Sequence, residues 1–421
     1  MTASAAEIAR ALGELREAGR ALRTRGAGPV LDALGAVLEE WRDAGSAPRR
    51  ALAAELPKAA GFTQPVVERG LAVALEGFTH GALRELYERE LGDAARGTGS
   101  RLASGFPTTA VLLAGAIPSA ALVALLAPLA LRSAVLAKPA ARDPLTAPLL
   151  HASLARRDAG LAASLRAVAF DAREDEAVDA FLAADCVVAT GADATVARLA
   201  ARVAPPRRFV GYGHRVSFAA LGAEALGGAA LEDACARLAL DVALWDQLGC
   251  LSPVALLVAG DAAAARSAAE ALAAALARIE RELPRGALAP EAAAAIAHER
   301  AEAELRAAAH GRVALFAGQA STVVAEADAR PRPVPLHRFV RVLPCSTPDG
   351  VADALAPYGP HLAAVGLAGF GAGAARLAEA LAALGASRVC PLGAMQAPPL
   401  SWCHDGQGVL APLARLTSVE G

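Results

Sequence analysis

The chain has 421 residues, enough for two or three domains with sizeable cores. Apolar residues make up 55% of the sequence but aromatic residues only 4%, so Leu, Val and Ala must build most of the core. The formal net charge is −2, which excludes an overall field that attracts nucleic acid or an anionic membrane. We therefore expect a globular protein that does not bind nucleic acid.

Six cysteines are scattered along the chain without the CxxC or CxxxH spacing of a zinc site or the density of a disulfide framework. The first residues form a charged amphipathic pattern that lacks the apolar core of a signal peptide. We therefore expect a reduced, cytoplasmic protein without a metal site.

Residues 109–131 carry no charge and are long enough to suggest a membrane span. Gly115 and Pro118 interrupt this run after a strand-like segment, and Pro128 lies in its second half. A strand, a turn and a buried helix explain such a run better than a transmembrane helix. We predict no membrane span.

The first 105 residues predict helices, because apolar side chains recur at three- and four-residue spacing. From residue 109 onward, short apolar runs alternate with helical segments in two blocks, which predicts parallel sheets covered on both faces. A long helical region is expected over residues 262–308. The predicted strands are Thr109–Ala114, Ala134–Ala137, Leu165–Phe170, Cys186–Ala189 and Arg208–Gly211 in the first block, and Pro253–Val258, Val313–Ala317, Thr322–Ala325, Phe339–Leu343, Ala363–Leu367 and Arg388–Pro391 in the second.

Cys250 is the strongest candidate for chemistry. It lies in the segment DVALWDQLGCLSP, where a predicted helix ends and Gly249 permits a tight turn at the boundary between the two blocks. An exposed thiol on such a turn can attack an electrophile when its pKa is depressed. The alternative is a structural cysteine, since cysteine often behaves as a small buried hydrophobe.

Four segments, taken in order, resemble one family. They are AGAIPSAAL, VLAKPAARDPLT, WDQLGCLSP and GAMQAPPLSWCHDGQGVL, within residues 105–421. They are similar to the strand–turn–helix, the VxKPSxxxP signature, the nucleophile turn and the Gly-Met…His-Asp-Gly tail of the LuxC-type acyl-CoA reductase family, a branch of the aldehyde dehydrogenase superfamily.

The resemblance implies an aldehyde dehydrogenase-like α/β fold: two Rossmann-like three-layer α/β domains and a helical N-terminal region. The implied parts are a helical region (1–105) packed on the cofactor domain, a cofactor-binding domain (106–235), a catalytic domain with the nucleophile (236–400) and a tail (401–421) that is a possible oligomerisation segment. Superfamily members usually assemble by adding tail strands to a neighbour's sheet, so a homo-oligomer is expected.

The resemblance also implies roles for individual residues. Cys250 is the nucleophile that receives the acyl group, and Lys138 faces the ribose hydroxyls of the cofactor. Thr190 and Gly191, at a strand end before a helix, suit a pyrophosphate. The alternatives are a solvated surface lysine and an ordinary strand–helix turn. The complete predicted cofactor-binding set is Lys138, Pro139, Thr190, Gly191 and Gly213.

His214, in VGYGHRVSF, is the second candidate catalytic group. A histidine there can lower the pKa of the cysteine or handle the proton of the thiol leaving group. Alternatively, His214 or Arg215 holds a cofactor phosphate, or the segment is only a surface turn. His404 and Asp405 are interpreted as a structural pair in the tail, with a direct chemical role as the alternative.

Two departures from the superfamily pattern matter for the reaction. VGYGHRVSF lacks the glutamate that activates hydrolytic water, which fits deacylation by hydride rather than by water. Ala116 stands near the place of an asparagine that helps to hold the oxyanion, and loss of one such donor typically costs about 3 kcal/mol of transition-state stabilisation. Either catalysis is slow, or another group donates a hydrogen bond to the oxyanion in place of the asparagine.

A second motif competes for the cofactor. Gly369-x-Gly371-x-x-Ala374 follows a predicted strand and precedes a helix, as a Rossmann fingerprint does. No acidic residue ends the next strand at the expected distance, so we interpret this motif as a tight turn in the second block.

The sequence therefore predicts an enzyme that reduces an acyl thioester, carried by CoA or acyl carrier protein, to an aldehyde through a Cys250 acyl-enzyme. NADPH is the expected cofactor and NADH is possible; Arg142 can meet a 2′-phosphate, although Asp143 beside it weakens that argument. The nicotinamide is expected to reach Cys250 across a cleft between the blocks. The alternatives are an aldehyde or semialdehyde dehydrogenase and a catalytically silent homologue that serves as a scaffold.

Overall fold

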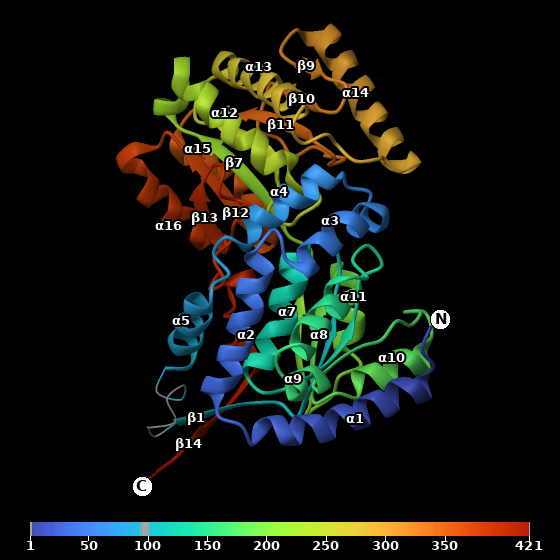
Figure 1. Cartoon of the computed structure of the whole chain (residues 1–421). Coiled ribbons are helices and arrows are strands. Elements are labelled where there is room, and N and C mark those ends of the chain that lie inside the picture. The colour runs from blue at the N-terminus through green and yellow to red at the C-terminus, as the bar shows by residue number, and fades with distance from the viewer. Residues whose placement is uncertain (1, 93, 95–100, 421) are drawn as a thin grey trace. The chain divides into compact units, whose positions relative to one another are not determined.

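A computed structural model describes residues 2–92, 94 and 101–420. The chain divides into two compact units, each built from separate stretches of sequence. Unit 1 comprises residues 1–60, 74–214 and 399–421, and unit 2 comprises residues 61–73 and 215–398. Both are mixed α/β units with largely parallel sheets, so the predicted fold class is confirmed (Figure 1).

Unit 1 contains a five-stranded sheet in the order β4-β3-β2-β5-β6, with every neighbouring pair parallel. The three central strands are almost entirely buried, as a parallel sheet with two covered faces requires. The strands are β2 (Thr108–Leu112), β3 (Ala134–Lys138), β4 (Leu165–Ala167), β5 (Cys186–Thr190) and β6 (Arg208–Tyr212).

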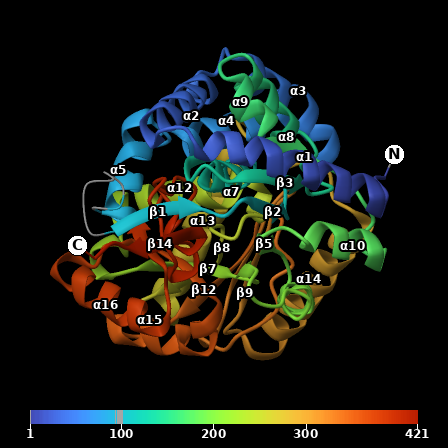
Figure 2. The ribbon, with the colours of Figure 1, turned by 90° about the horizontal axis from the view of Figure 1, so that it is seen from below.

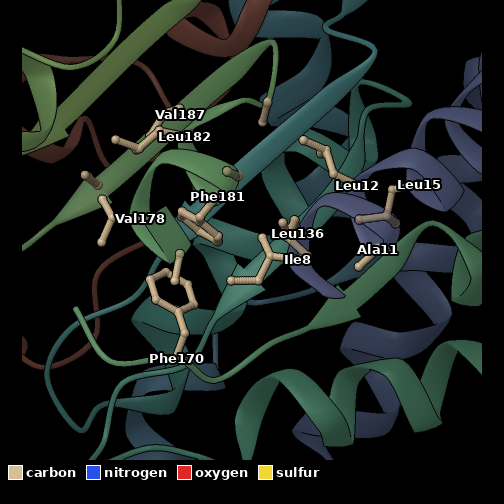
Figure 3. Close-up of a cluster of buried hydrophobic side chains, with 14 of the residues drawn as sticks. Ile8, Ala11, Leu12, Leu15, Leu136, Phe170, Val178, Phe181, Leu182 and Val187 are labelled. Atoms are coloured by element: carbon tan, nitrogen blue, oxygen red, sulfur yellow. The ribbon is translucent and has the colours of Figure 1, made fainter. Parts of the chain in front are cut away.

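The first helix, α1 (Ala5–Arg23), covers one face of this sheet. Ser4 caps its N-terminus in a capping box with Glu7, which satisfies otherwise unpaired backbone N–H groups. Its apolar face places Ile8, Leu12 and Leu15 in a buried cluster with residues of the central strands and of α10 (Asp175–Leu182). Figure 3 shows these side chains converging with Phe181. The predicted helical N-terminal region is thus confirmed, and α1 forms part of the core of unit 1.

The remaining helices of the N-terminal region follow one another without an intervening strand, and those that follow β2 lie between the strands of the unit 1 sheet. In the N-terminal region they are α2 (Ala27–Arg42), α3 (Ala47–Ala60), α4 (Gln64–Leu75) and α5 (His80–Leu91). Between the strands of unit 1 they are α7 (Pro118–Ala130), α8 (Thr146–Ala155), α9 (Ala159–Ala163) and α11 (Asp193–Ala200).

The uncharged run 109–131 forms most of strand β2, a turn with Gly115 at φ +82°, and the buried helix α7. This confirms the interpretation as strand, turn and buried helix. Across the residues that the structure describes, every helix is too short or too polar to cross a membrane.

Unit 2 contains a seven-stranded sheet in the order β13-β12-β7-β8-β11-β10-β9, in which only β9 runs antiparallel to its neighbour. Its strands are β7 (Val216–Leu221), β8 (Pro253–Val258), β9 (Ala314–Ala317), β10 (Thr322–Ala325), β11 (Phe339–Pro344), β12 (Leu362–Ala368) and β13 (Arg388–Pro391). Its helices are α12 (Gly228–Ala243), α13 (Ala262–Ile279), α14 (Pro290–His310), α15 (Pro348–Leu355) and α16 (Ala374–Leu384).

Unit 2 differs from the sequence expectation in two places. Strand β7 was not predicted; it pairs with β8 and β12 and belongs to unit 2, whose longer stretch starts at Arg215. The helical region 262–308 is two helices, because the segment 280–289 contains Pro284 and leads into Pro290 at the start of α14. The turn at Gly369 joins β12 to the short segment before α16, which confirms its interpretation as a strand–helix turn.

A two-stranded antiparallel ribbon joins two distant parts of unit 1. Strand β1 (Arg101–Gly105) pairs with β14 (Ala414–Ser418), and Figure 2 shows the two side by side. The expectation of helix was therefore wrong for residues 101–105. Both strands are short, and β14 is mostly exposed; each depends on a partner about 300 residues away in sequence, which local periodicity does not reveal.

Candidate active site

The predicted cofactor residues lie at one edge of the unit 1 sheet. Numbered in chain order, its strands lie in the order 3-2-1-4-5. Strands β3 and β4 are added on one side of β2, and β5 and β6 on the other, so the order reverses between β2 and β5. In open α/β sheets, ligands bind at the carboxyl ends of the strands beside such a switch point. Lys138 ends β3, Thr190 ends β5, and Gly213 follows β6. The topology therefore brings these residues to the edge where a dinucleotide is expected.

Lys138 is half-buried at the end of β3, paired in register with Leu112. Its Nζ lies 5.2 Å from the centre of the Phe170 ring, a cation–π contact that orients the ammonium group. Burial lowers the pKa of Lys138, and the charge of Asp171 opposes this shift. Pro139 follows immediately and is also half-buried. Lys138 is thus a partly buried cation in contact with an aromatic ring rather than a fully solvated surface lysine.

Gly191 leaves open space at the end of β5. A Cβ added there would meet nothing closer than 3.8 Å, on the side chain of Thr195, so a ligand can approach the backbone. Helix α11 begins two residues later, with its positive dipole end at this edge. The Gly191 N–H donates to the Tyr212 carbonyl at 3.1 Å, and Asp193 adds a negative charge at the helix start. The edge therefore offers space and a helix dipole, partly offset by that carboxylate.

His214 is exposed after β6, and its backbone N–H donates to Asp193 Oδ1 at 2.7 Å. This bond fixes the backbone of His214 against the start of α11. His214 therefore shares the carboxyl edge of the sheet with the predicted cofactor residues.

The C-terminal tail contributes an aromatic stack to unit 1. The His404 ring lies parallel to Tyr212 with centroids 4.6 Å apart, and Trp402 packs at 4.8 Å from the same ring. The carboxylate of Asp405 lies 3.7 Å from His404 Nε2. Sequence reasoning singled out His404 and Asp405 but missed Tyr212 and Trp402, because aromatic residues 190 positions apart gave no local signal.

Cys250 lies in unit 2, on the turn that precedes β8, and is exposed. Its carbonyl accepts a hydrogen bond of 2.6 Å from the Ser217 hydroxyl at the start of β7. The same hydroxyl oxygen accepts from the Ala364 N–H of β12 at 3.2 Å. The turn is thereby fixed to the amino ends of two neighbouring strands. Within the described residues the other cysteine classed as exposed is Cys403, and no cluster of three or more acidic, histidine or cysteine side chains is arranged to hold a metal ion.

A buried carboxylate in unit 2 holds a segment that is hydrogen-bonded to the same turn. Asp241, at the end of α12, is fully buried and accepts N–H bonds from Gly393 at 2.6 Å and Met395 at 3.0 Å. The side chain of Gln396 then donates to the Asp241 carbonyl and to the Ser252 hydroxyl, both at 3.2 Å. The GAMQ segment of the tail motif is therefore connected through hydrogen bonds to a residue two positions from Cys250.

Burial raises the pKa of Asp241 to about 7, and the backbone N–H donors and Arg388 only partly oppose this shift. The folded protein then binds a proton between about pH 4 and pH 7 that the unfolded chain has released. The contribution of this group to the free energy of unfolding should fall as the pH rises through that window, by up to about 4 kcal/mol.

Comparison with Asp241→Asn, which cannot ionise, isolates this contribution. The difference in free energy of unfolding, wild type minus variant, is expected to decrease from pH 4 to pH 7 and to stay constant above it. Denaturant titrations at each pH measure this difference. A difference that does not change with pH would contradict the raised pKa.

Solved structures match nearly the whole chain and define its fold. An aldehyde dehydrogenase from Brucella melitensis biovar abortus 2308 superposes with a TM-score of 0.73 and 16% identity, covering 100% of this chain and 91% of that one. Aldehyde dehydrogenase 21 from Physcomitrella patens, in complex with the product succinate, gives 0.74 and 16%, covering 99% and 90%. The NADP-dependent glyceraldehyde-3-phosphate dehydrogenase from Bacillus halodurans C-125, complexed with NADP, gives 0.70 and 13%, covering 100% and 92%. The predicted aldehyde dehydrogenase-like fold is thus confirmed.

The particular family is narrower than this fold. The family described as acyl-CoA reductase (LuxC) matches residues 27–417, so the chain belongs to the LuxC acyl-CoA reductase family. The predicted family is confirmed, and the protein is an oxidoreductase of the aldehyde dehydrogenase fold. No curated protein matches the sequence.

Proposed function

We propose that this chain reduces an acyl thioester to an aldehyde through a covalent intermediate on Cys250. The observation that carries the proposal is an exposed cysteine on a turn held by Ser217 in a member of an acyl-CoA reductase family. A thiolate is the nucleophile that such a reaction needs, and an exposed turn gives an acyl carrier access to it.

The proposed chemistry has two halves. Sγ of Cys250 attacks the thioester carbonyl, a new S–C bond forms, and the carrier thiolate leaves and takes up a proton. When bound, NADPH supplies a hydride to the carbonyl carbon of the acyl-enzyme. The hydride leaves a negative charge on the oxygen of the tetrahedral adduct at Cys250; the C=O bond then re-forms, the C–S bond breaks, and the aldehyde and the cysteine thiolate are released.

We assign the proton steps to His214. An imidazole is the usual group for proton transfer near neutral pH, and His214 is exposed with its backbone fixed by Asp193. It would give a proton to the leaving carrier thiolate. The segment that contains His214 lacks a glutamate to activate water, which favours release of the acyl group by hydride rather than by hydrolysis.

The residues at the carboxyl edge of unit 1 fit a nicotinamide dinucleotide. Lys138 would bond the ribose hydroxyls beside Pro139, and Thr190, Gly191 and Gly213 would border the pyrophosphate, where the missing Cβ of Gly191 leaves room. The preference for NADPH over NADH is part of the proposal. It is based on Arg142, which could meet a 2′-phosphate and whose guanidinium donates to the Ala60 carbonyl at 2.6 Å.

The carrier is CoA or acyl carrier protein, and we propose that the enzyme acts as a homo-oligomer in the cytoplasm. Intact-mass spectra after addition of a panel of acyl-CoAs test the covalent intermediate, because an acyl adduct reports both chain length and site. NADPH consumption together with aldehyde release tests the complete reaction. Oxidation of free aldehyde without any reduction of acyl-CoA would instead identify an aldehyde dehydrogenase, and the absence of both activities a scaffold.

Lys138→Met is expected to raise the KM for NADPH about 10- to 100-fold with a smaller change in kcat. The variant loses a charged hydrogen-bond donor worth about 1.5–3 kcal/mol. Steady-state kinetics with varied NADPH measure the change. The chain offers a matched control in Lys58, its only other lysine, which is exposed and paired with Glu55. Equal effects of Lys58→Met and Lys138→Met would contradict the assignment.

A further inference from the structure

Two short segments of unit 2 have an unusual backbone. Trp245, Asp246 and Gln247 have φ of 56°, 49° and 65°, immediately before the nucleophile turn. Residues 336–338 have φ of 64°, 56° and 68°, immediately before β11. None of these six residues is glycine, and a side chain makes the left-handed region unfavourable. Three such residues in a row persist only where surrounding contacts fix them.

Arg338 and Asp246 fix the two segments to each other. Arg338 is 1% exposed, and its guanidinium has five N–H donors. Two reach Asp246 Oδ1 at 3.0 and 2.6 Å, and the others reach Glu280 Oε2 at 2.6 Å and the carbonyls of Leu283 at 2.8 Å and Ala243 at 3.2 Å. Every donor is used. Asp246 Oδ2 in turn accepts the Gly286 N–H at 3.0 Å.

Gln247 makes a second connection between the same segments. Its amide nitrogen donates to the carbonyls of Pro253 and Phe339, both at 2.9 Å, and its amide oxygen accepts the Phe339 N–H at 2.9 Å. The parallel pairing of β8 with β11 starts at Ala255 and Arg341, so Pro253 and Phe339 are the positions where the ladder would continue. The Gln247 side chain bridges the strands there, at the place where the nucleophile turn enters β8.

We propose that Asp246, Gln247 and Arg338 are positioning residues for the nucleophile, which hold the turn so that Cys250 meets the thioester carbonyl. The inference rests on the proposed function, since it takes Cys250 as the nucleophile. Cys250 lies three residues after Gln247 and three before Pro253, so its backbone is anchored on both sides by one side chain. A shift of the reacting atom by about 1 Å can cost about 100-fold in rate.

Arg338→Lys tests this role, because an ammonium has three donors and cannot reproduce the five bonds of the guanidinium. Arg341→Lys is the matched control. Arg341 is also 1% exposed and is paired with the buried Glu326 and the partly buried Glu299, outside the nucleophile turn. Its guanidinium lies over the Phe339 ring at 5.3 Å, a contact that a lysine can keep.

The measurement is the single-turnover rate of carrier-thiol release from acyl-CoA, expressed per Cys250 that iodoacetamide can alkylate. Arg338→Lys should slow this rate by about 10- to 100-fold while Cys250 remains alkylatable, and Arg341→Lys should leave it within about twofold. A purely structural role would lower the stability or the alkylatable fraction of both variants without separating their rates per competent cysteine. Gln247→Met, which keeps the length but loses all three bonds, replaces Arg338→Lys if that variant does not fold.

The outcomes separate the two proposals. If the unsubstituted chain acylates at Cys250 and Arg338→Lys or Gln247→Met acylates as fast as Arg341→Lys, the positioning role is wrong and the proposed function stands. If the unsubstituted chain forms no acyl-enzyme at Cys250, the proposed function fails and the positioning role fails with it.

Discussion

Replacing Cys250 with alanine is expected to lower kcat for acyl-CoA reduction by at least about 10³-fold, because the variant has no atom to accept the acyl group. The loss should appear in both halves of the reaction: no acyl adduct in the intact-mass spectrum and no NADPH consumption above background. Binding of the cofactor should be unchanged, since the cofactor residues proposed above belong to unit 1.

Cys403→Ala is the control for this prediction. Cys403 is exposed like Cys250, so a general thiol reagent can reach both. Selective labelling of Cys250 together with full activity of Cys403→Ala is the expected result. Full activity of Cys250→Ala would overturn the covalent mechanism, and adduct formation at Cys403 instead would move the nucleophile to the tail.

Trp245→Ala is expected to destabilise unit 2 by about 3–5 kcal/mol, the usual cost of deleting a fully buried indole. Trp245 is 1% exposed, and the edge of one ring meets the face of the other in its contact with Phe62, at a centroid distance of 5.7 Å. Gly70 packs so closely that an added Cβ would lie 2.5 Å from Trp245 Cζ2. The indole therefore fills a space that no neighbouring side chain can occupy without rearrangement.

Denaturant titration followed by circular dichroism measures this loss. Trp402→Ala is the control, because Trp402 is only half-buried and belongs to unit 1. It should cost clearly less and should leave the transition of unit 2 in place. A cost below about 1 kcal/mol for Trp245→Ala would show that the surrounding residues collapse into the cavity.

Periodicity predicted most of the fold. The apolar runs of β2, β3 and β5 are buried on both faces, and this burial is why their sequences are almost uniformly hydrophobic. Strand β7 was missed although VSFAAL is equally apolar, because it follows directly on a segment that had been interpreted as part of the cofactor site. Strands β1 and β14 are short and lack a continuous buried apolar run, so only their pairing with each other makes them strands.

The candidate site was only partly visible in the sequence. Cys250 was recognised because it follows Gly249 in a turn, and Lys138 because the chain has only one other lysine. In the structure, the Cys250 carbonyl accepts a hydrogen bond from Ser217, and the Lys138 ammonium contacts the Phe170 ring. The left-handed segment at Trp245–Gln247 could not be predicted, since propensity reserves that conformation for glycine and here distant contacts with Arg338 and Phe339 impose it. The same holds for Asp241, whose burial follows from packing and not from its neighbours in sequence.

The chain passes between its two units four times, at residues 60/61, 73/74, 214/215 and 398/399. A chimera that exchanged residues 1–105 with those of a relative would therefore replace Phe62 and Gly70, which belong to unit 2 together with Trp245 and pack against it. An exchange of segments between related chains preserves the core of unit 2 only when residues 61–73 and residues 215–398 come from the same parent. Because the thirteen residues 61–73 of unit 2 lie in sequence between two stretches of unit 1, neither unit can be exchanged as one continuous segment.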